Sequence, residues 1–258
     1  MQTIGKKISN KLHVNKIYEG SYEFYRHANI YSEEFFEVYR DSKNLTYNFI
    51  AQLHCRLTSG ELLNMSLEYV VSKEFIPLSV QIQRKLREQI VNEYFIYDRK
   101  QSIIHYRFSK GKKHKDLKVS TPPKFHIATS FACSSTLFIR SKKFDNNTTN
   151  TYNMIVSNNL WEYKYPLTSK KVALDAMSTV SEILNIDGNN VEAMPYRLYE
   201  STQSNKKKEF SQRNKTSLSG AVQIHMSHHL GIPYIINEDN NNTKIKIKYL
   251  QNLEKSLS

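Results

Sequence analysis

Residues 45–57 read LTYNFIAQLHCRL, with an apolar side chain at every second position. Side chains on a β-strand point alternately to the two faces of the sheet, so this period predicts a strand whose sheet is packed on one face. At about 3.3 Å per residue the strand would reach roughly 40 Å, and a sheet of such strands twists and curls. We therefore expect a mainly β protein with a strongly curved antiparallel sheet or half-open β-barrel.

The segments on either side of this strand continue the pattern of strands and turns. Further strands are expected at 17–27, 33–40, 63–71, 76–84, 89–97 and 102–108, with turn residues between them, as at 58–61. Consecutive strands joined by short turns are normally neighbours in a sheet. Residues 17–108 therefore predict a meander, and residues 1–16 a polar N-terminal arm.

A break in the strand pattern is expected at 109–140. The basic stretch 110–118 (KGKKHKDLK) reads as a loop, and the Pro122-Pro123 pair ends regular structure after it. From residue 129 to 140 the spacing changes to three and four, at Phe131, Ser134, Ser135 and Phe138. This spacing favours a short helix or helical turn, which would plug the concave face or lid the open end.

A second set of strands is expected between residues 150 and 249. The segments are 152–156, 160–165, 170–174, 179–186, 191–200, 220–226, 232–236 and 244–249, and Asp187-Gly188-Asn189 is a strong hairpin signal. In all we expect about a dozen strands and one or two short helices, in a single domain over 17–258.

The bulk composition excludes several classes of protein. The chain has 258 residues, 39% of them hydrophobic, with 17 Tyr and 12 Phe to fill a core. It contains no apolar run of the roughly 20 residues that a membrane helix needs, and residues 1–14 lack the apolar centre of a secretory signal. We expect a cytoplasmic or peripheral membrane location, or a periplasmic one if a leader was removed. The two cysteines form no disulfide framework, and Cys55 is expected to be a buried thiol.

The net charge of +13 is concentrated in two stretches, 110–118 and 205–215, each with five basic residues and one acidic residue. Solvated surface is one explanation, and an anionic partner is the other. We expect contact with an anionic membrane surface through Lys112, Lys113, Lys115, Lys206, Lys207 and Lys208. Nucleic-acid binding is not expected, because aromatic residues are not interleaved with these charges.

Three groups of residues are candidates for sites of chemistry. His225, His228 and His229 form an H-x-x-H-H cluster, but a metal needs further ligands with fixed geometry, and turn polarity explains the cluster better. Outward solvation explains the carboxylates Glu33, Glu34 and Glu37. Cys133 with His126 would be a thiol–imidazole pair only if the two lay together in space. The sequence has no phosphate-binding glycine loop, and no cofactor is expected.

The order of elements resembles that of a known superfamily. Ile224-His225-Met226-Ser227, then residues 231–236 (GIPYII), together with 131–140 and the long strand, resemble the half-open barrels of the lipoprotein-carrier superfamily, the LolA and LolB type. The resemblance implies a curved sheet around a hydrophobic cavity that is lidded by helices and holds acyl chains. Carriers of that type work outside the cytoplasm, and no lipid-attachment cysteine is seen here. A similar barrel occurs in a cofactor-free enzyme of pigment biosynthesis.

The expected function is therefore non-catalytic binding or carriage of a hydrophobic or amphipathic, lipid-like ligand. The expected ligand-binding residues lie on the concave side of the predicted meander: Tyr22, Phe24, Tyr47, Phe49, Ala51, Leu53, Met65 and Leu67. One alternative is a cofactor-independent isomerase or cyclase that uses the same cavity. The other is a structural or interaction protein in which side chains fill the interior.

Overall fold

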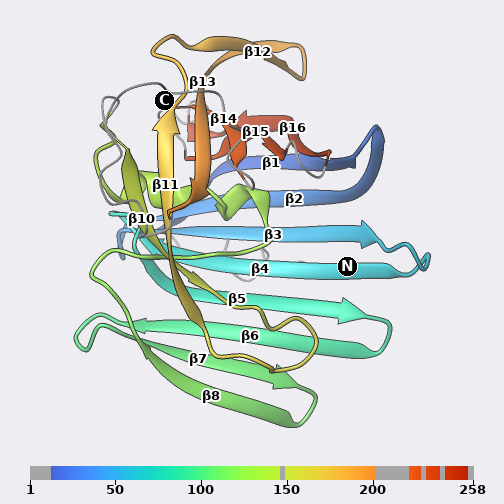
Figure 1. Cartoon of the computed structure of the whole chain (residues 1–258), viewed down its shortest axis with the longest axis vertical. Coiled ribbons are helices and arrows are strands. Elements are labelled where there is room, and N and C mark those ends of the chain that lie inside the picture. The colour runs from blue at the N-terminus through green and yellow to red at the C-terminus, as the bar shows by residue number, and fades with distance from the viewer. Residues whose placement is uncertain (1–12, 146–148, 202–220, 228–230, 239–241, 255–258) are drawn as a thin grey trace.

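The computed structural model describes residues 13–145, 149–201, 221–227, 231–238 and 242–254 (Figure 1). Its first half is a meander of eight antiparallel strands, each paired with the next along the chain. These strands are β1 (Val14–Arg26), β2 (Asn29–Asp41), β3 (Thr46–Arg56), β4 (Leu62–Ser72), β5 (Pro77–Leu86), β6 (Gln89–Asp98), β7 (Ile103–Lys110) and β8 (Lys113–Ser120).

The predicted long strand is confirmed as β3, and its register defines the concave face of the meander. Ala51 stands opposite Phe36 on β2 and opposite Leu67 on β4, and all three side chains are buried. On the neighbouring strand β1, Gly20 is paired with Phe36, and the two residues are in close contact. A Cβ atom at Gly20 would lie 2.7 Å from both the Phe36 ring and the Tyr249 carbonyl oxygen. Glycine is therefore required there, because a side chain has no room.

The second half continues the same sheet from the other side of β1. Its strands are β9 (His126–Ile127), β10 (Asn150–Val156), β11 (Thr168–Ala176), β12 (Glu182–Ile186), β13 (Asn189–Glu200), β14 (Val222–Met226), β15 (Pro233–Glu238) and β16 (Thr243–Asn252). β16 pairs with β1, the order then runs back through β15, β14, β13, β11 and β10 to β9, and β12 pairs only with β13. Only the β9–β10 pair is parallel among the described pairings. In Figure 1, β11 and β13 run across the direction of the meander strands, so the sheet is strongly curved and open.

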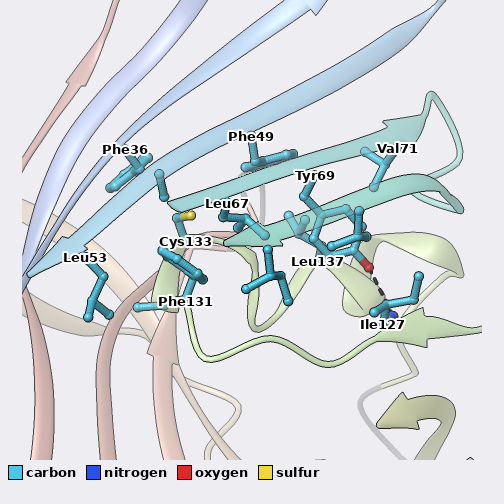
Figure 2. Close-up of a cluster of buried hydrophobic side chains, with 14 of the residues drawn as sticks. Phe36, Phe49, Leu53, Leu67, Tyr69, Val71, Ile127, Phe131, Cys133 and Leu137 are labelled. Atoms are coloured by element: carbon cyan, nitrogen blue, oxygen red, sulfur yellow. Dashed lines mark hydrogen bonds between the residues drawn. The ribbon is translucent and has the colours of Figure 1, made fainter. Parts of the chain in front are cut away.

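Residues 125–141, which we call the plug, fill the concave face of the meander. The plug contains two 3₁₀ turns, η1 (Ala132–Ser134) and η2 (Leu137–Ser141). Figure 2 shows Ile127, Phe131, Cys133 and Leu137 of the plug packed against side chains of β2, β3 and β4. These four plug residues are at most 1% exposed. The plug is therefore an integral part of the hydrophobic core.

A mainly β, curved sheet with a short helical segment is thus confirmed, but the strand count is 16 rather than about a dozen. The prediction of a loop at 110–118 was wrong, because Gly111 allows a two-residue turn and 113–120 pair with β7 as β8. The predicted strand at 160–165 was also wrong, since these residues form a non-strand segment. The polar arm ends sooner than expected, because Val14 already pairs with Asp41.

The prediction of a short helix or helical turn at 129–140 is confirmed in its second form. Two separate 3₁₀ turns form instead of one helix. The hydroxyl groups of Ser134 and Ser135 donate to the carbonyl oxygens of Phe131 and Ala132, which competes with helix continuation. In the described part of the chain, no helix has the length and apolarity needed to cross a bilayer.

Candidate ligand-binding groove

The β7–β8 hairpin forms one wall of a basic groove at the edge of the sheet. Gly111 has φ 58°, and glycine at the first turn position is what a type II′ hairpin turn requires. Lys110 stands opposite Lys113 and Phe108 opposite Lys115, so these four side chains share the concave face of the hairpin. Phe108 is buried, whereas Lys113 and Lys115 are exposed.

The opposite wall is the segment 157–167, which we call the strap. Asn159 organises it, because its side-chain oxygen accepts hydrogen bonds from the backbone N–H groups of Lys164 (2.8 Å) and Tyr165 (3.0 Å). The Asn159 amide nitrogen donates to the carbonyl oxygen of Tyr165 at 2.8 Å. These bonds close a compact loop, which explains why an aromatic-rich stretch around Trp161 does not form the strand expected of it.

A buried polar network holds the strap on strands β5–β7. The Glu93 carboxylate, which is 0% exposed, accepts hydrogen bonds from Arg84 (2.5 Å), from the Tyr106 hydroxyl (2.8 Å) and from the Ser157 hydroxyl of the strap. Burial, and then the charge of Glu93, raises the pKa of Tyr106 far above its usual value, so the phenol stays a hydrogen-bond donor. The network therefore fixes one wall of the groove relative to the other.

The groove has a volume of about 620 Å³ and combines aromatic rings with a high positive charge. The rings of Phe108 and Tyr163 have their centroids 6.3 Å apart. The complete lining is Phe108, Lys110, Lys112, Lys113, His114, Lys115, Glu162 and Tyr163. Such a surface can hold an apolar chain against the rings and an acidic group at the lysines.

The convex face of the same hairpin carries a second hollow, of about 760 Å³. Its charges are partly neutralised, because Arg107 donates two hydrogen bonds to Asp116, at 2.6 and 3.2 Å. Ile96, which is 58% exposed, contributes an apolar side chain. Lys112, Lys113 and His114 line both hollows, so the hairpin tip is accessible from two sides.

The ligand-binding residues expected from the sequence lie elsewhere, in or beside the core. Six of them are at most 6% exposed, namely Tyr22, Phe24, Phe49, Ala51, Leu53 and Leu67. Tyr47 and Met65 are half-buried and pack against this core. None of the eight lines either hollow of the β7–β8 hairpin. Ligand binding at these residues stays a prediction.

The expected lysines divide between two regions. Lys112, Lys113 and Lys115 all line the groove. Lys206, Lys207 and Lys208 lie outside the described residues. The groove was missed because 110–118 read as a loop, although Leu117 and Val119, with Lys118 between them, were a usable strand signal.

The interpretation of Glu34 as an outward, solvated carboxylate was wrong. Its side chain is 0% exposed, because β2 points it into the core opposite Tyr22 on β1 and Leu53 on β3. It accepts hydrogen bonds from the plug backbone, at Ala132 N (2.7 Å) and Cys133 N (2.9 Å). Burial raises the pKa of Glu34 to about 7, against the opposing effect of these N–H groups. Glu34 is thus the anchor of the plug.

The other candidate sites are not assembled among the described residues. His225 lies 3.2 Å from Glu182, whereas His228 and His229 lie outside the described part, and no metal-binding group of His, Cys, Asp or Glu is found in that part. Cys133 is buried beside Glu34, to which its backbone N–H donates a hydrogen bond, whereas the His126 ring stacks on Tyr69. Cys133 and His126 therefore have different partners. Burial lowers the pKa of His126 to about 3, which keeps the imidazole neutral.

Comparisons with known proteins support the fold. No family model and no curated protein matches the chain. The structure is similar to a DUF1849 β-barrel-like protein from Brucella abortus, with TM-score 0.52, 8% identity, and coverage of 92% of this chain and 98% of that one. It is also similar to a DUF1089 family protein from Pseudomonas aeruginosa, with TM-score 0.46, 10% identity, and coverage of 79% and 88%. The Brucella match shows a β-barrel-like fold. It supports this broad class and does not support the lipoprotein-carrier superfamily in particular.

Proposed function

We propose that the protein binds an amphipathic, lipid-like molecule without catalysis, and that the ligand lies in the groove between the β7–β8 hairpin and the strap. The observation that carries this proposal is the lining itself, in which the Phe108 and Tyr163 rings lie beside four lysines in about 620 Å³. An apolar chain on the rings gains burial energy, and an acidic headgroup gains contacts with ammonium groups. The resemblance to acyl-chain carriers agrees with this class of ligand.

The groove is preferred over the interior wall because the plug already occupies the interior. A ligand at Phe49 or Leu67 would have to replace plug side chains such as Phe131 and Leu137. Each of these contributes about 1.5–3 kcal/mol of burial energy, so their removal is costly. The groove needs no such rearrangement, since Tyr163 and the lysines are accessible as the chain is folded.

The lysines of the hairpin would also place the groove at an anionic membrane surface. Each basic residue near such a surface contributes about 1 kcal/mol. Binding of Lys112, Lys113 and Lys115 to lipid headgroups would then bring the mouth of the groove to the lipid that it takes up. Lys206, Lys207 and Lys208 remain proposed contacts of the same kind.

Ligand extraction and a fluorescent fatty acid test this function. Mass spectrometry of an organic extract of the purified protein should detect a bound amphiphile, and the protein should take up the fatty acid. Tyr163→Ala should weaken uptake by about tenfold, because it removes one ring of the groove. The matched control is Tyr165→Ala, on the same strap but outside the groove lining and 57% exposed. An empty extract together with no uptake would overturn the proposal.

Vesicle sedimentation tests the membrane contact separately. The chain should bind phosphatidylcholine vesicles that contain phosphatidylserine more strongly than vesicles of phosphatidylcholine alone. Replacing Lys112, Lys113 and Lys115 together by Gln should reduce the difference. Equal binding to both vesicle types would contradict a role for the hairpin at an anionic surface.

A further inference from the structure

Pairs of like-charged residues on neighbouring strands of the sheet are bridged by an opposite charge, except in the β7–β8 hairpin. Like-charged residues stand directly opposite one another at Glu19–Glu37, at Glu23–Glu33 and at Lys110–Lys113. Side chains in such pairs have Cβ atoms about 4.5–5.5 Å apart, and like charges at this distance are destabilising.

The two glutamate pairs are neutralised from within the protein. The Lys16 ammonium group lies 2.6 Å from Glu19 and 3.1 Å from Glu37. Lys248 bridges the other pair, at 3.0 Å from Glu23 and 3.7 Å from Glu33. In both cases one opposite charge sits between two like charges and offsets their repulsion.

The lysine pair has no such bridge among the described residues. No carboxylate in the described part of the chain forms an ion pair with Lys110, Lys112, Lys113 or Lys115. Glu162, the one acidic residue in the groove lining, has its carboxylate 3.9 Å from Lys164 of the strap instead. Within the described part of the chain, no carboxylate offsets the repulsion between these two lysines.

We propose that Lys110 and Lys113 clamp a phosphate group, with Lys115 beside them, and that the ligand of the groove is an amphiphile with a phosphate monoester headgroup. This inference rests on the proposed function and names its ligand class. A phosphate monoester carries about −1.5 to −2 charges and three acceptor oxygens near neutral pH, so one group can accept hydrogen bonds from both ammonium groups. A carboxylate has one charge and two oxygens, and it leaves more of the lysine charge unneutralised.

The geometry also sets the direction of the ligand. Lys113 and Lys115 follow one another on the concave face of β8, and Lys115 is paired with Phe108. A headgroup at the Lys110–Lys113 end therefore has its chain directed past Lys115 toward the Phe108 and Tyr163 rings. The tip of the hairpin, which is exposed, holds the charged end of the ligand.

Calorimetric titration with four probes tests the headgroup. The probes are oleoyl lysophosphatidic acid, oleic acid, oleoyl lysophosphatidylcholine and inorganic phosphate, each used below its aggregation concentration. We expect lysophosphatidic acid to bind about 10- to 100-fold more tightly than the other two lipids. Weak binding of inorganic phosphate that competes with lysophosphatidic acid would support the same clamp. Tighter binding of inorganic phosphate than of the lipid would mean that free phosphate is the ligand and would overturn the lipid assignment.

Two variants make the test specific. Lys110→Glu replaces the like-charged pair by an opposite pair, so it should abolish the preference for lysophosphatidic acid while Tm stays equal or rises. The control is Lys118→Gln, which removes a lysine from the convex face of the same strand and should leave the preference unchanged. A retained preference in Lys110→Glu would overturn the clamp.

The outcomes separate this inference from the proposed function. If no lipid probe binds, the groove function fails, and the clamp fails with it. If all three lipids bind equally well and Tyr163→Ala weakens each of them, the groove function stands and only the phosphate clamp is overturned.

Discussion

The concave face of the meander is filled at strands β2–β5 and open at the β7–β8 hairpin. In the filled region, the plug packs Phe131 and Leu137 against the strands (Figure 2). In the open region, the hairpin and the strap leave a groove of about 620 Å³ lined by rings and lysines. The difference teaches that the most apolar wall is packed against the plug and serves stability, whereas an open groove remains at the sheet edge, where the covering segment is shorter.

Each covering segment is anchored by a buried carboxylate, and the two carboxylates are compensated differently. Glu93 under the strap has Arg84 as an opposite charge at 2.5 Å. Glu34 under the plug has two backbone N–H donors, and no lysine or arginine pairs with it among the described residues. The titratable groups beside it are the Tyr22 phenol and the Cys133 thiol, whose pKa values burial raises. The two anchors should therefore respond differently to mutation and to pH.

The largest effect is expected when the strap anchor is broken. Glu93→Ala leaves Arg84 buried without its partner and should lower the free energy of unfolding by about 3–5 kcal/mol. Urea denaturation measures this loss. The double variant Arg84→Met with Glu93→Leu should recover part of it, because no buried charge remains. A loss below about 1 kcal/mol in Glu93→Ala would mean that the pair does not hold the fold.

Breaking the plug anchor should have a smaller effect. Glu34→Ala leaves the backbone N–H groups of Ala132 and Cys133 without acceptors in the core and should cost about 2–4 kcal/mol. Glu34→Gln keeps one acceptor oxygen and nearly the same volume, so it should cost less. Thermal or urea unfolding compares the three proteins. Equal losses in Ala and Gln variants would contradict an anchor that acts through hydrogen bonds.

The plug anchor Glu34 should also make the stability of the protein depend on pH. Glu34 has its pKa raised to about 7 in the folded chain, against 4.5 in the unfolded one, so the folded state binds more protons between these values. The contribution of Glu34 to the free energy of unfolding is fully present below pH 4.5. It is lost as the pH rises through 7, and the loss is on the order of 3 kcal/mol. Unfolding titrations between pH 5 and 8 should show this slope in the native protein and a reduced slope in Glu34→Gln. Parallel slopes in both proteins would assign the pH dependence to other groups.

Much of the fold could be predicted from alternation along single segments. The strand at 45–57, the meander around it and the Asp187-Gly188 turn were all predicted and are confirmed, the last with φ values of 50° and 77° at its two turn residues. Alternation works here because one face of the sheet is buried and the other is not.

The remaining features depend on partners that are distant in sequence. Glu34 shares a strand face with Phe36, but its hydrogen-bond donors lie 98 and 99 positions away, so the partners that allow a carboxylate to be buried there could not be read from its neighbours. The strap looked like a strand because Trp161 and Tyr163 favour strands, but the side chain of Asn159 closes it into a loop. The groove was not predicted, and its lysines were expected only as contacts with a membrane surface, because the second wall of the groove comes from a segment some 50 residues later.

The most direct test compares one truncation in each half of the concave face. Met65→Ala removes a side chain from the wall that the plug covers, and Tyr163→Ala removes one from the groove. Both variants should be checked by circular dichroism and then titrated with the fluorescent fatty acid. We predict that Tyr163→Ala weakens binding by about tenfold while Met65→Ala binds like the native protein. Loss of binding in Met65→Ala, with native affinity in Tyr163→Ala, would place the ligand under the plug and contradict the groove.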